Sequence, residues 1–439
     1  MATPVMDRPV AHPEWCASLD DLTLDTTGLP GRFVVVHTLT TVAGVNLNRD
    51  FDNLPKRILV GGVERLRVSA QAKARAARTW TRAYVARTDQ ADRSRLLPGK
   101  VAEHLVTQYG RDEYDATLTA AALVAATGVG VDETNSARTT AVTFLAAGAD
   151  ATLADLVHQH WDDLAEAREE MGRAGDAARA TRVAKGKKGG RSQASTDSDE
   201  SPGDTPVEGE PADDNATATS KTAAKKVPAA LAKLAMRIYD PGFNIDLALY
   251  GRMLANLPSG GTVPGATQVA HLVSVDPLAE TVDPYTVVDD WQGDEHFGAA
   301  NIGEQFLASG TLYGYAALDR AVLEAAFTGH PHADQHQALA EKLFVAAMLW
   351  AVPSGKRTRT ASAVRPTLAI AATTNHPYTA WPAFDDALPA PAGLAAADRL
   401  AEYLRSNQAV GGLRAGHALW ISPDGSPAPT HLPDCLTVR

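Results

Sequence analysis

The 439-residue chain has only two cysteines, few aromatic side chains and no long hydrophobic run. Cys16 and Cys435 lie near opposite ends and form neither a metal-binding nor a redox spacing, which favours a reducing, cytoplasmic location. No stretch approaches the roughly 18 consecutive apolar residues of a membrane span. Residues 1–20 also lack the apolar segment of a secretory signal. We therefore expect no membrane partner.

Charge is distributed unevenly along the chain. The net charge is −11 at pH 7, yet residues 49–95 contain twelve Lys and Arg against five Asp and Glu. A basic segment concentrated on an acidic chain is the electrostatic signature of a phosphate-binding surface. The composition thus favours a nucleic-acid backbone as a partner.

The basic segment is predicted to contain a strand followed by a helix. Residues 63–68 alternate in polarity, which would place Arg65 and Arg67 side by side on the open face of a strand. Ser69 then caps a helix expected over residues 70–86. The strand arginines and the basic helix residues would form one continuous patch.

The other elements are predicted from hydrophobic patterning. Strands are expected at residues 32–39, 244–250, 285–291, 304–315 and 367–372, and helices over much of 100–172 and at 334–351. Residues 284–315 would form a long hairpin with a polar loop. Residues 172–226 have almost no large apolar side chains, which predicts a disordered insertion. The order of the elements predicts an α+β fold of two layers.

No motif of the chain predicts a catalytic or metal site. Residues 353–357 contain a Gly-Lys pair but lack the first glycine and the Ser or Thr of a phosphate-binding P-loop. The spacing of His330, His332 and His336 does not place them on one helical face, and a solvated turn is the simpler interpretation. The acidic pair at 289–290 has no partner for acid–base chemistry. We expect a protein that is not an enzyme and uses no metal or cofactor.

Several motifs occur in the order found in a known family. They are residues 33–37, 47–50, 61–62, 67–71, 246–253, 268–271, 287–290, 302–306, 312–315 and 353–359. Together they resemble the backbone subunit of the type I-E CRISPR Cascade complex, the CasC family. The resemblance covers nearly the whole chain except residues 1–30 and 172–226.

The resemblance implies a hand-like α+β fold. The palm would be RRM-like (ferredoxin-like) and comprise residues 31–87, 241–281 and 309–439. Residues 88–240 would form a helical finger domain containing the disordered insertion at about 172–226. A β-hairpin thumb would occupy residues 282–308, and residues 1–30 would be an N-terminal extension.

The resemblance also implies a function and partners. In this family about six copies polymerise along one CRISPR RNA (crRNA), and each thumb crosses the neighbour's RNA so that about every sixth base is flipped out. The guide then pairs with target DNA in antiviral defence, so sequence recognition is left to base pairing. The other partners are the large, small, belly and crRNA-processing subunits of Cascade.

The resemblance assigns guide-RNA binding to residues within these motifs and close to them in sequence. They are Arg49, Lys56, Arg65, Arg67, Ser69, Gln71, Lys73, Arg75, Arg78, Arg252, Met253, Lys356 and Arg357. The basic residues would fix the position of the phosphate backbone without reading sequence, and Met253 matches a position where an apolar side chain wedges beside a base. Relatives commonly carry lysine at the position of Ala74, and we expect Lys73 to reach the same phosphate.

Two other functions remain open at this point. Related backbone subunits of RNA-targeting CRISPR complexes cut their target with a loop aspartate, so a metal-dependent ribonuclease using Asp50, Asp289 or Asp290 is one alternative. The sequence shows no second metal ligand beside them, which disfavours it. The other alternative is an RRM-like RNA-binding protein that acts alone rather than polymerising.

Overall fold

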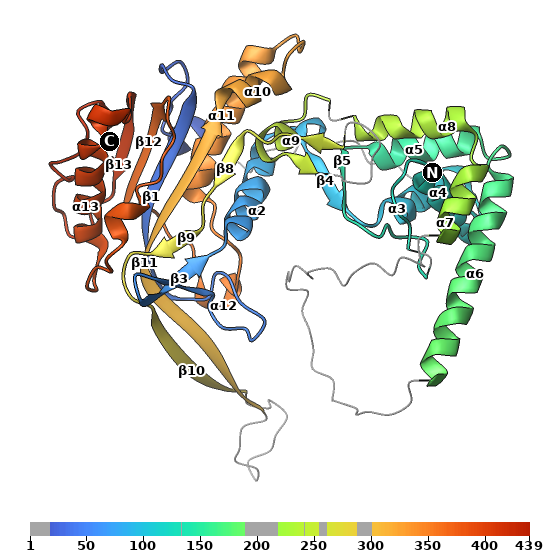
Figure 1. The fold of residues 1–439 in the computed structure, drawn as a ribbon, viewed down its shortest axis with the longest axis horizontal. Helices are drawn as coiled ribbons and strands as arrows, with labels where there is room; N and C mark the ends of the chain where they lie inside the picture. Colours follow the sequence, from blue (N-terminus) through green and yellow to red (C-terminus); the bar gives the residue numbers. More distant parts are fainter. Residues whose placement is uncertain (1–17, 133, 189–217, 241, 254–260, 288–300) are drawn as a thin grey trace. The chain divides into compact units, whose positions relative to one another are not determined.

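The computed structural model describes residues 18–132, 134–188, 218–240, 242–253, 261–287 and 301–439. The chain forms two compact units (Figure 1). Unit 1 comprises Met1–Arg87, Ile245–Gly251 and Pro264–Arg439, and unit 2 comprises Thr88–Asn244 and Arg252–Val263. The short helix η2 (Arg87–Asp89) lies where the first segments of the two units meet in sequence.

Unit 1 is built on one large, mostly antiparallel sheet. Its strand order is β14-β13-β12-β1-β11-β9-β3-β2, and β8 and β10 also pair with β11. The strands are β1 (Phe33–Val45), β2 (Arg57–Val60), β3 (Val63–Val68), β8 (Thr267–Val269), β9 (Leu272–Ser274), β10 (Ala279–Val287), β11 (Asn301–Asp319), β12 (Leu368–Thr374), β13 (Ala415–Trp420) and β14 (Leu436–Val438). The sequence did not predict β13 and β14. The central position expected for β1 is confirmed, because β1 pairs with β11 on one side and β12 on the other.

Helices cover both faces of this sheet. They are α1 (Leu19–Leu22), α2 (Ala70–Thr81), η1 (Arg82–Tyr84), α9 (Ile245–Tyr250), α10 (Arg320–Ala326), α11 (Ala333–Trp350), α12 (Arg357–Thr360), η4 (Trp381–Phe384), α13 (Gly393–Ser406) and η5 (Gln408–Val410). Val34 and Val36 of β1 pack with α2, α9 and α11, whereas Val35 and Leu39 pack with η4 and α13. Successive strand residues point to opposite faces, so the continuous apolar run of β1 contributes to two cores. Unit 1 therefore has three layers where the sequence predicted two.

A long hairpin extends from the sheet of unit 1 (Figure 1). β10 pairs with the first part of the 19-residue strand β11, from Ala279 opposite Ser309 to Val287 opposite Asn301. The later part of β11 pairs with β1 within the sheet. The expected hairpin is confirmed, and its tip at residues 288–300 lies outside the described residues.

Unit 2 is mainly helical. Its elements are β4 (Ala91–Ser94), α3 (Leu97–Tyr109), α4 (Glu113–Ala126), β5 (Thr143–Ala146), α5 (Ala149–Gln159), α6 (Ala165–Lys188), α7 (Ala218–Lys226), α8 (Ala229–Ala235), η3 (Met236–Tyr239), β6 (Arg252–Met253) and β7 (Thr262–Val263). Leu105 of α3, Leu123 of α4 and Leu153 of α5 meet in its core. Within the described parts of the chain, no helix is long and apolar enough to cross a membrane.

One predicted element is wrong, and a second is wrong at its two described ends. Residues 244–250 do not form a strand, because most of them form helix α9, whose residues Ile245 to Leu249 are all buried. A short apolar run does not distinguish a strand from a buried helix by its periodicity. The predicted disordered insertion at 172–226 is helical at both described ends, and Ala223 of α7 is buried in the core of unit 2. Residues 189–217 lie outside the described residues.

Candidate nucleic-acid interface

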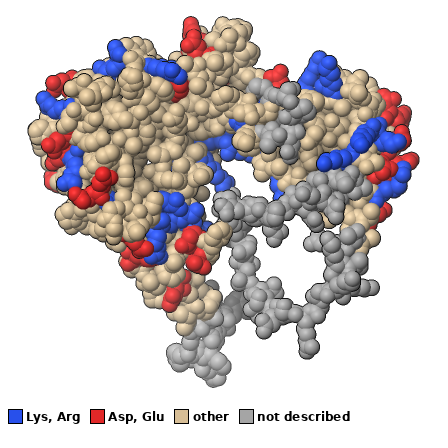
Figure 2. Space-filling view, in the orientation of Figure 1, with Lys and Arg blue, Asp and Glu red and all other residues tan. Residues whose placement is uncertain are grey.

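Unit 1 carries a group of basic side chains around β3 and α12. This basic cluster, as we define it, consists of Arg49, Lys56, Arg67, His271, Lys356, Arg357 and Arg359. Figure 2 shows Lys and Arg side chains gathered where Figure 1 places α12 and β3. The cluster brings together segments that are far apart in the sequence.

The first half of the cluster forms around Lys356. A Cβ on Gly355 would collide with the Leu47 carbonyl oxygen, so only glycine allows this turn to approach the segment that precedes Arg49. Burial, and then the charges of Arg49 and Arg359, lower the pKa of Lys356. Like charges held this close repel one another, and a bound phosphate would relieve that repulsion.

The second half of the cluster consists of Lys56, Arg67 and His271. The Lys56 amide donates to the Asn48 carbonyl (2.9 Å), and the Arg67 amide donates to the Lys56 carbonyl (2.8 Å). His271 Nδ1 accepts a hydrogen bond from the Ala70 amide at the start of α2 (2.9 Å), which leaves Nε2 as the donor of the ring. Burial, and then the charges of Arg67 and Lys56, lower the pKa of His271.

Three further predicted residues are exposed. Gln71 and Arg75 lie on the exposed side of α2. Met253 is 75 % exposed, so it is not a core residue of unit 2, and its role as a wedge stays a prediction. Ser69, in contrast, is buried, and its hydroxyl accepts a hydrogen bond from the Ala72 amide (3.2 Å) as the N-cap of α2. The cap expected at Ser69 is confirmed. The hydroxyl proton is not used by this contact, so the assignment of Ser69 to RNA stays a prediction.

Arg65 and Lys73 were predicted to contact phosphate, but the structure buries both side chains inside unit 1. Arg65 is 0 % exposed and donates to the carbonyls of Phe384 (2.9 Å) and Asp385 (2.8 Å), because η4 and the residue after it cover this face of β3. Lys73 Nζ donates to the Ala351 carbonyl (2.6 Å) after the last turn of α11, and burial lowers the pKa of Lys73 to about 7. Adjacent helix positions differ by about 100°, so Lys73 faces α11 and not the direction of Ala74.

Arg78 and Arg252 are also buried, contrary to the prediction. Arg78 Nη2 lies 3.2 Å from Asp246 Oδ2 inside unit 1. Arg252 belongs to unit 2, where it donates to the carbonyls of Tyr239 (2.6 Å) and Phe144 (3.2 Å). Both guanidiniums hold segments of the fold together, so we remove them from the set of candidate RNA contacts.

Sequence reasoning missed two members of the cluster. His271 stood within the motif at 268–271 and Arg359 within the motif at 353–359, but neither was assigned to RNA. The run of basic residues from 356 to 359 was the available signal for Arg359. His271 could not be found in this way, since only the folded chain brings it next to Lys56 and Arg67.

Of the three aspartates considered for the nuclease alternative, the structure describes only Asp50. Asp50 Oδ1 accepts hydrogen bonds from the amides of Asp52 (3.0 Å) and Leu54 (2.9 Å), so this carboxylate stabilises a turn. Asp289 and Asp290 lie outside the described residues. No observation therefore favours a cleavage site at Asp50.

Three histidines come together at the start of α11, which their spacing did not predict. The ring centroids of His330 and His336 are 4.2 Å apart. His330 Nδ1 accepts from the His332 amide (3.0 Å), and His336 Nδ1 lies 3.0 Å from the His332 carbonyl oxygen. Over the part of the chain that the structure describes, no group of three or more His, Cys, Asp or Glu side chains is arranged to hold a metal ion.

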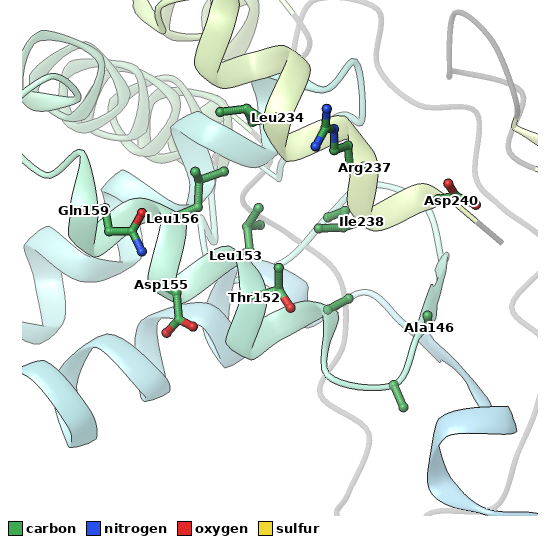
Figure 3. Close-up of a pocket in the computed structure, with 12 residues that line it drawn as sticks. Ala146, Thr152, Leu153, Asp155, Leu156, Gln159, Leu234, Arg237, Ile238 and Asp240 are labelled. Carbon is green, nitrogen blue, oxygen red and sulfur yellow. The ribbon is translucent and has the colours of Figure 1, made fainter. Parts of the chain in front are cut away.

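A pocket of about 440 Å³ lies wholly within unit 2 (Figure 3). Leu153 and Leu156 of α5 and Ile238 of η3 contribute apolar side chains to its wall, and Arg237 and Asp240 add one charge of each sign. Its lining residues include no nucleophile paired with a base. The pocket offers apolar contact but no catalytic chemistry.

The chain is similar to a known protein family and to solved structures. The family described as "CT1975-like protein" matches residues 34–431. A chain of a "CRISPR RNA-guided surveillance complex, pre-nicking" has a similar fold, with a TM-score of 0.67 and 24% identity over 93% of this chain and 96% of that chain. A chain of a "CRISPR RNA-guided surveillance complex" has a TM-score of 0.60 and 22% identity over 91% of this chain and 94% of that chain. No curated protein gives a significant match.

Proposed function

The chain belongs to the CT1975-like protein family of CRISPR-associated proteins, and from this premise we propose that it binds guide RNA in a CRISPR surveillance complex. In this proposal it is the non-catalytic backbone subunit of a type I-E Cascade and uses no cofactor. About six copies polymerise along one crRNA in the cytoplasm and present it for pairing with target DNA in antiviral defence. Both structural relatives are chains of RNA-guided surveillance complexes, which supports this role.

The basic cluster on unit 1 is the observation that carries the proposal. Arg49, Lys56, Arg67, His271 and the turn at 356–359 concentrate positive charge on one region of an acidic chain. The Asn46 side-chain amide donates to the Phe306 carbonyl of β11 (3.0 Å), so the segment that carries Arg49 is attached to the hairpin. An RNA backbone bound along the cluster would therefore run past the base of the hairpin.

The topology supports the RRM-like (ferredoxin-like) palm. The strands β12-β1-β11-β9 are neighbours in this order, α2 follows β1 in the chain, and α11 connects β11 to β12. We assign the palm to unit 1, the fingers to unit 2 and the thumb to the β10–β11 hairpin. The thumb would cross the RNA of the neighbouring copy, and Met253 would wedge beside a flipped base.

Assembly on RNA tests this proposal. The purified chain is run on size-exclusion chromatography with light scattering, alone and with a single-stranded RNA of guide length. We expect the RNA to convert the protein into a regular multimer whose size grows with RNA length. One monomer per RNA with a single footprint would show instead that the protein acts alone.

The same assembly distinguishes the scaffold from the nuclease alternative. It is incubated with RNA complementary to the guide in the presence of Mg²⁺. We expect the complementary RNA to remain intact, since Asp50 stabilises a turn and no metal-binding group accompanies it among the described residues. Cleavage at regular intervals would establish a ribonuclease and overturn the non-catalytic assignment.

A further inference from the structure

A second pocket lies wholly within unit 1 and has a volume of about 480 Å³. It is bounded by β2, β8, β9 and β11 and by the segment 377–381 that leads into η4. Most of its lining is apolar or aromatic, and its largest members are Tyr313, Tyr315, Tyr378 and Trp381. This volume falls in the range of pockets that enclose a small organic ligand.

The aromatic walls of this pocket are held in place by contacts outside it. The Tyr313 hydroxyl accepts a hydrogen bond from the Ala380 amide (2.8 Å) and lies 2.9 Å from His37 Nδ1. The ring of Trp381 stacks on Tyr313, with centroids 6.1 Å apart and planes inclined by 22°. The guanidinium of the buried Arg65 lies over the Trp381 ring at 5.6 Å. The walls are therefore organised before any ligand arrives, which lowers the entropic cost of binding.

The pocket adjoins the basic cluster. His271 lines the pocket, and the charges of Arg67 and Lys56 contribute to lowering the pKa of its ring. Cationic groups therefore lie close to one wall of the pocket. Burial lowers the pKa of His37, which lies behind Tyr313, to about 3, so this imidazole stays neutral. An apolar aromatic cavity next to cations matches a ligand with a flat unsaturated ring and an attached phosphate.

We infer that this pocket binds one unpaired base of a single-stranded RNA, while the adjoining phosphate contacts Lys56 and Arg67. Every base has a π-face, so stacking on tyrosine and tryptophan is tolerant of sequence. The inference rests on the proposed function, because it adds a base subsite to an RNA-binding surface. It differs from the phosphate contacts in that it requires a base and not only charge.

The test compares two ligands of equal charge. One is an oligouridylate of about eight nucleotides, and the other is an abasic ribose-phosphate chain of the same length. We expect the full-length protein to bind the oligouridylate about tenfold more tightly, since stacking one base contributes a factor of this size. Equal binding of the two ligands would overturn the inference. Binding of neither ligand would overturn the proposed function itself.

Single substitutions test whether residues of this pocket cause the preference for the oligouridylate. Tyr378→Leu introduces an apolar side chain and removes a buried hydroxyl that has no hydrogen-bond partner among the described residues. We expect it to abolish the base preference, while the matched substitution Tyr114→Leu on α4 of unit 2 retains it. Lys56→Gln should lower the affinity for both ligands by the same factor, because it removes a contact to phosphate. A Tyr378→Leu protein that keeps the full preference would contradict the assignment.

A measurement on the unmodified protein guards against misfolding of the variants. Oligouridylate containing 5-iodouridine is crosslinked by light, and the modified peptides are identified by mass spectrometry. We expect crosslinks to Tyr315, Tyr378 or Trp381. Crosslinks confined to other aromatic residues would place the base elsewhere and refute the subsite.

Discussion

Arg78 of α2 and Asp246 of α9 form an ion pair inside unit 1, with 3.2 Å between Nη2 and Oδ2. The two side chains are only 11% and 2% exposed. Arg82 Nε lies 3.7 Å from the same carboxylate oxygen. Two guanidiniums thus surround one buried carboxylate and join two helices that are far apart in sequence.

This ion pair predicts that Arg78 and its neighbour Arg75 have different roles. Arg78→Gln should lower the free energy of unfolding by about 3 kcal/mol, because it removes a partner of a buried charge. Arg75→Gln on the exposed side of the same helix should change it by less than about 0.5 kcal/mol. Chemical denaturation followed by tryptophan fluorescence measures both values. Equal stability of the two variants would contradict the structural role of Arg78.

Lys73 should make stability depend on pH. Burial lowers the pKa of Lys73 to about 7 from the ordinary 10.5. In the window between these two pH values the folded chain has released a proton that the unfolded chain still binds. Stability then rises with pH. We expect the unfolding free energy of the natural protein, minus that of Lys73→Met, to increase by about 1 kcal/mol per pH unit across the window. Urea denaturation of both proteins at several pH values checks this, and a constant difference would refute it.

Arg357 and Arg359 should contribute to RNA binding through charge alone. Replacing both with glutamine should weaken binding to unrelated single-stranded sequences by the same factor. It should also reduce the slope of log affinity against log salt by about 0.7 for each phosphate that the variant no longer neutralises. Arg405→Gln on α13, whose side chain is 48% exposed, is the matched control and should have little effect. A weakening restricted to particular sequences would argue for base recognition instead.

Met253 should help to unstack a base of the bound RNA and should not contribute to the stability of the fold. Because its side chain is 75 % exposed, Met253→Ala should leave the melting temperature unchanged. Met348→Ala in α11 is the contrasting control, since this side chain is 4 % exposed and its removal should cost about 2–5 kcal/mol. In the RNA assembly, Met253→Ala should reduce the fluorescence of 2-aminopurine at the unstacked guide positions. Unchanged fluorescence would remove Met253 as the wedge.

The elements that the sequence predicted correctly have strong local patterns. The β-branched run of β1, the pairing of two strands into a hairpin and the amphipathic helix α11 were all confirmed. The error at α9 arose where a short apolar run was buried on every side, so that its periodicity carried no information. For unit 2, the small side chain of Ala223 gave no hydrophobic signal for helix α7, although this residue packs into the core.

The sequence by itself determined that the chain is mixed α and β, that it contains a long hairpin and that positive charge is concentrated between residues 49 and 95. Only the tertiary structure decided which of these charges reach solvent. Segments distant in sequence supply the carbonyls that bind Arg65 and Lys73 and the carboxylate that binds Arg78. Periodicity reports which face of an element is apolar, but what packs against a long basic side chain depends on contacts between elements. For this reason the fold removed buried cations from the predicted surface and added His271 and Arg359.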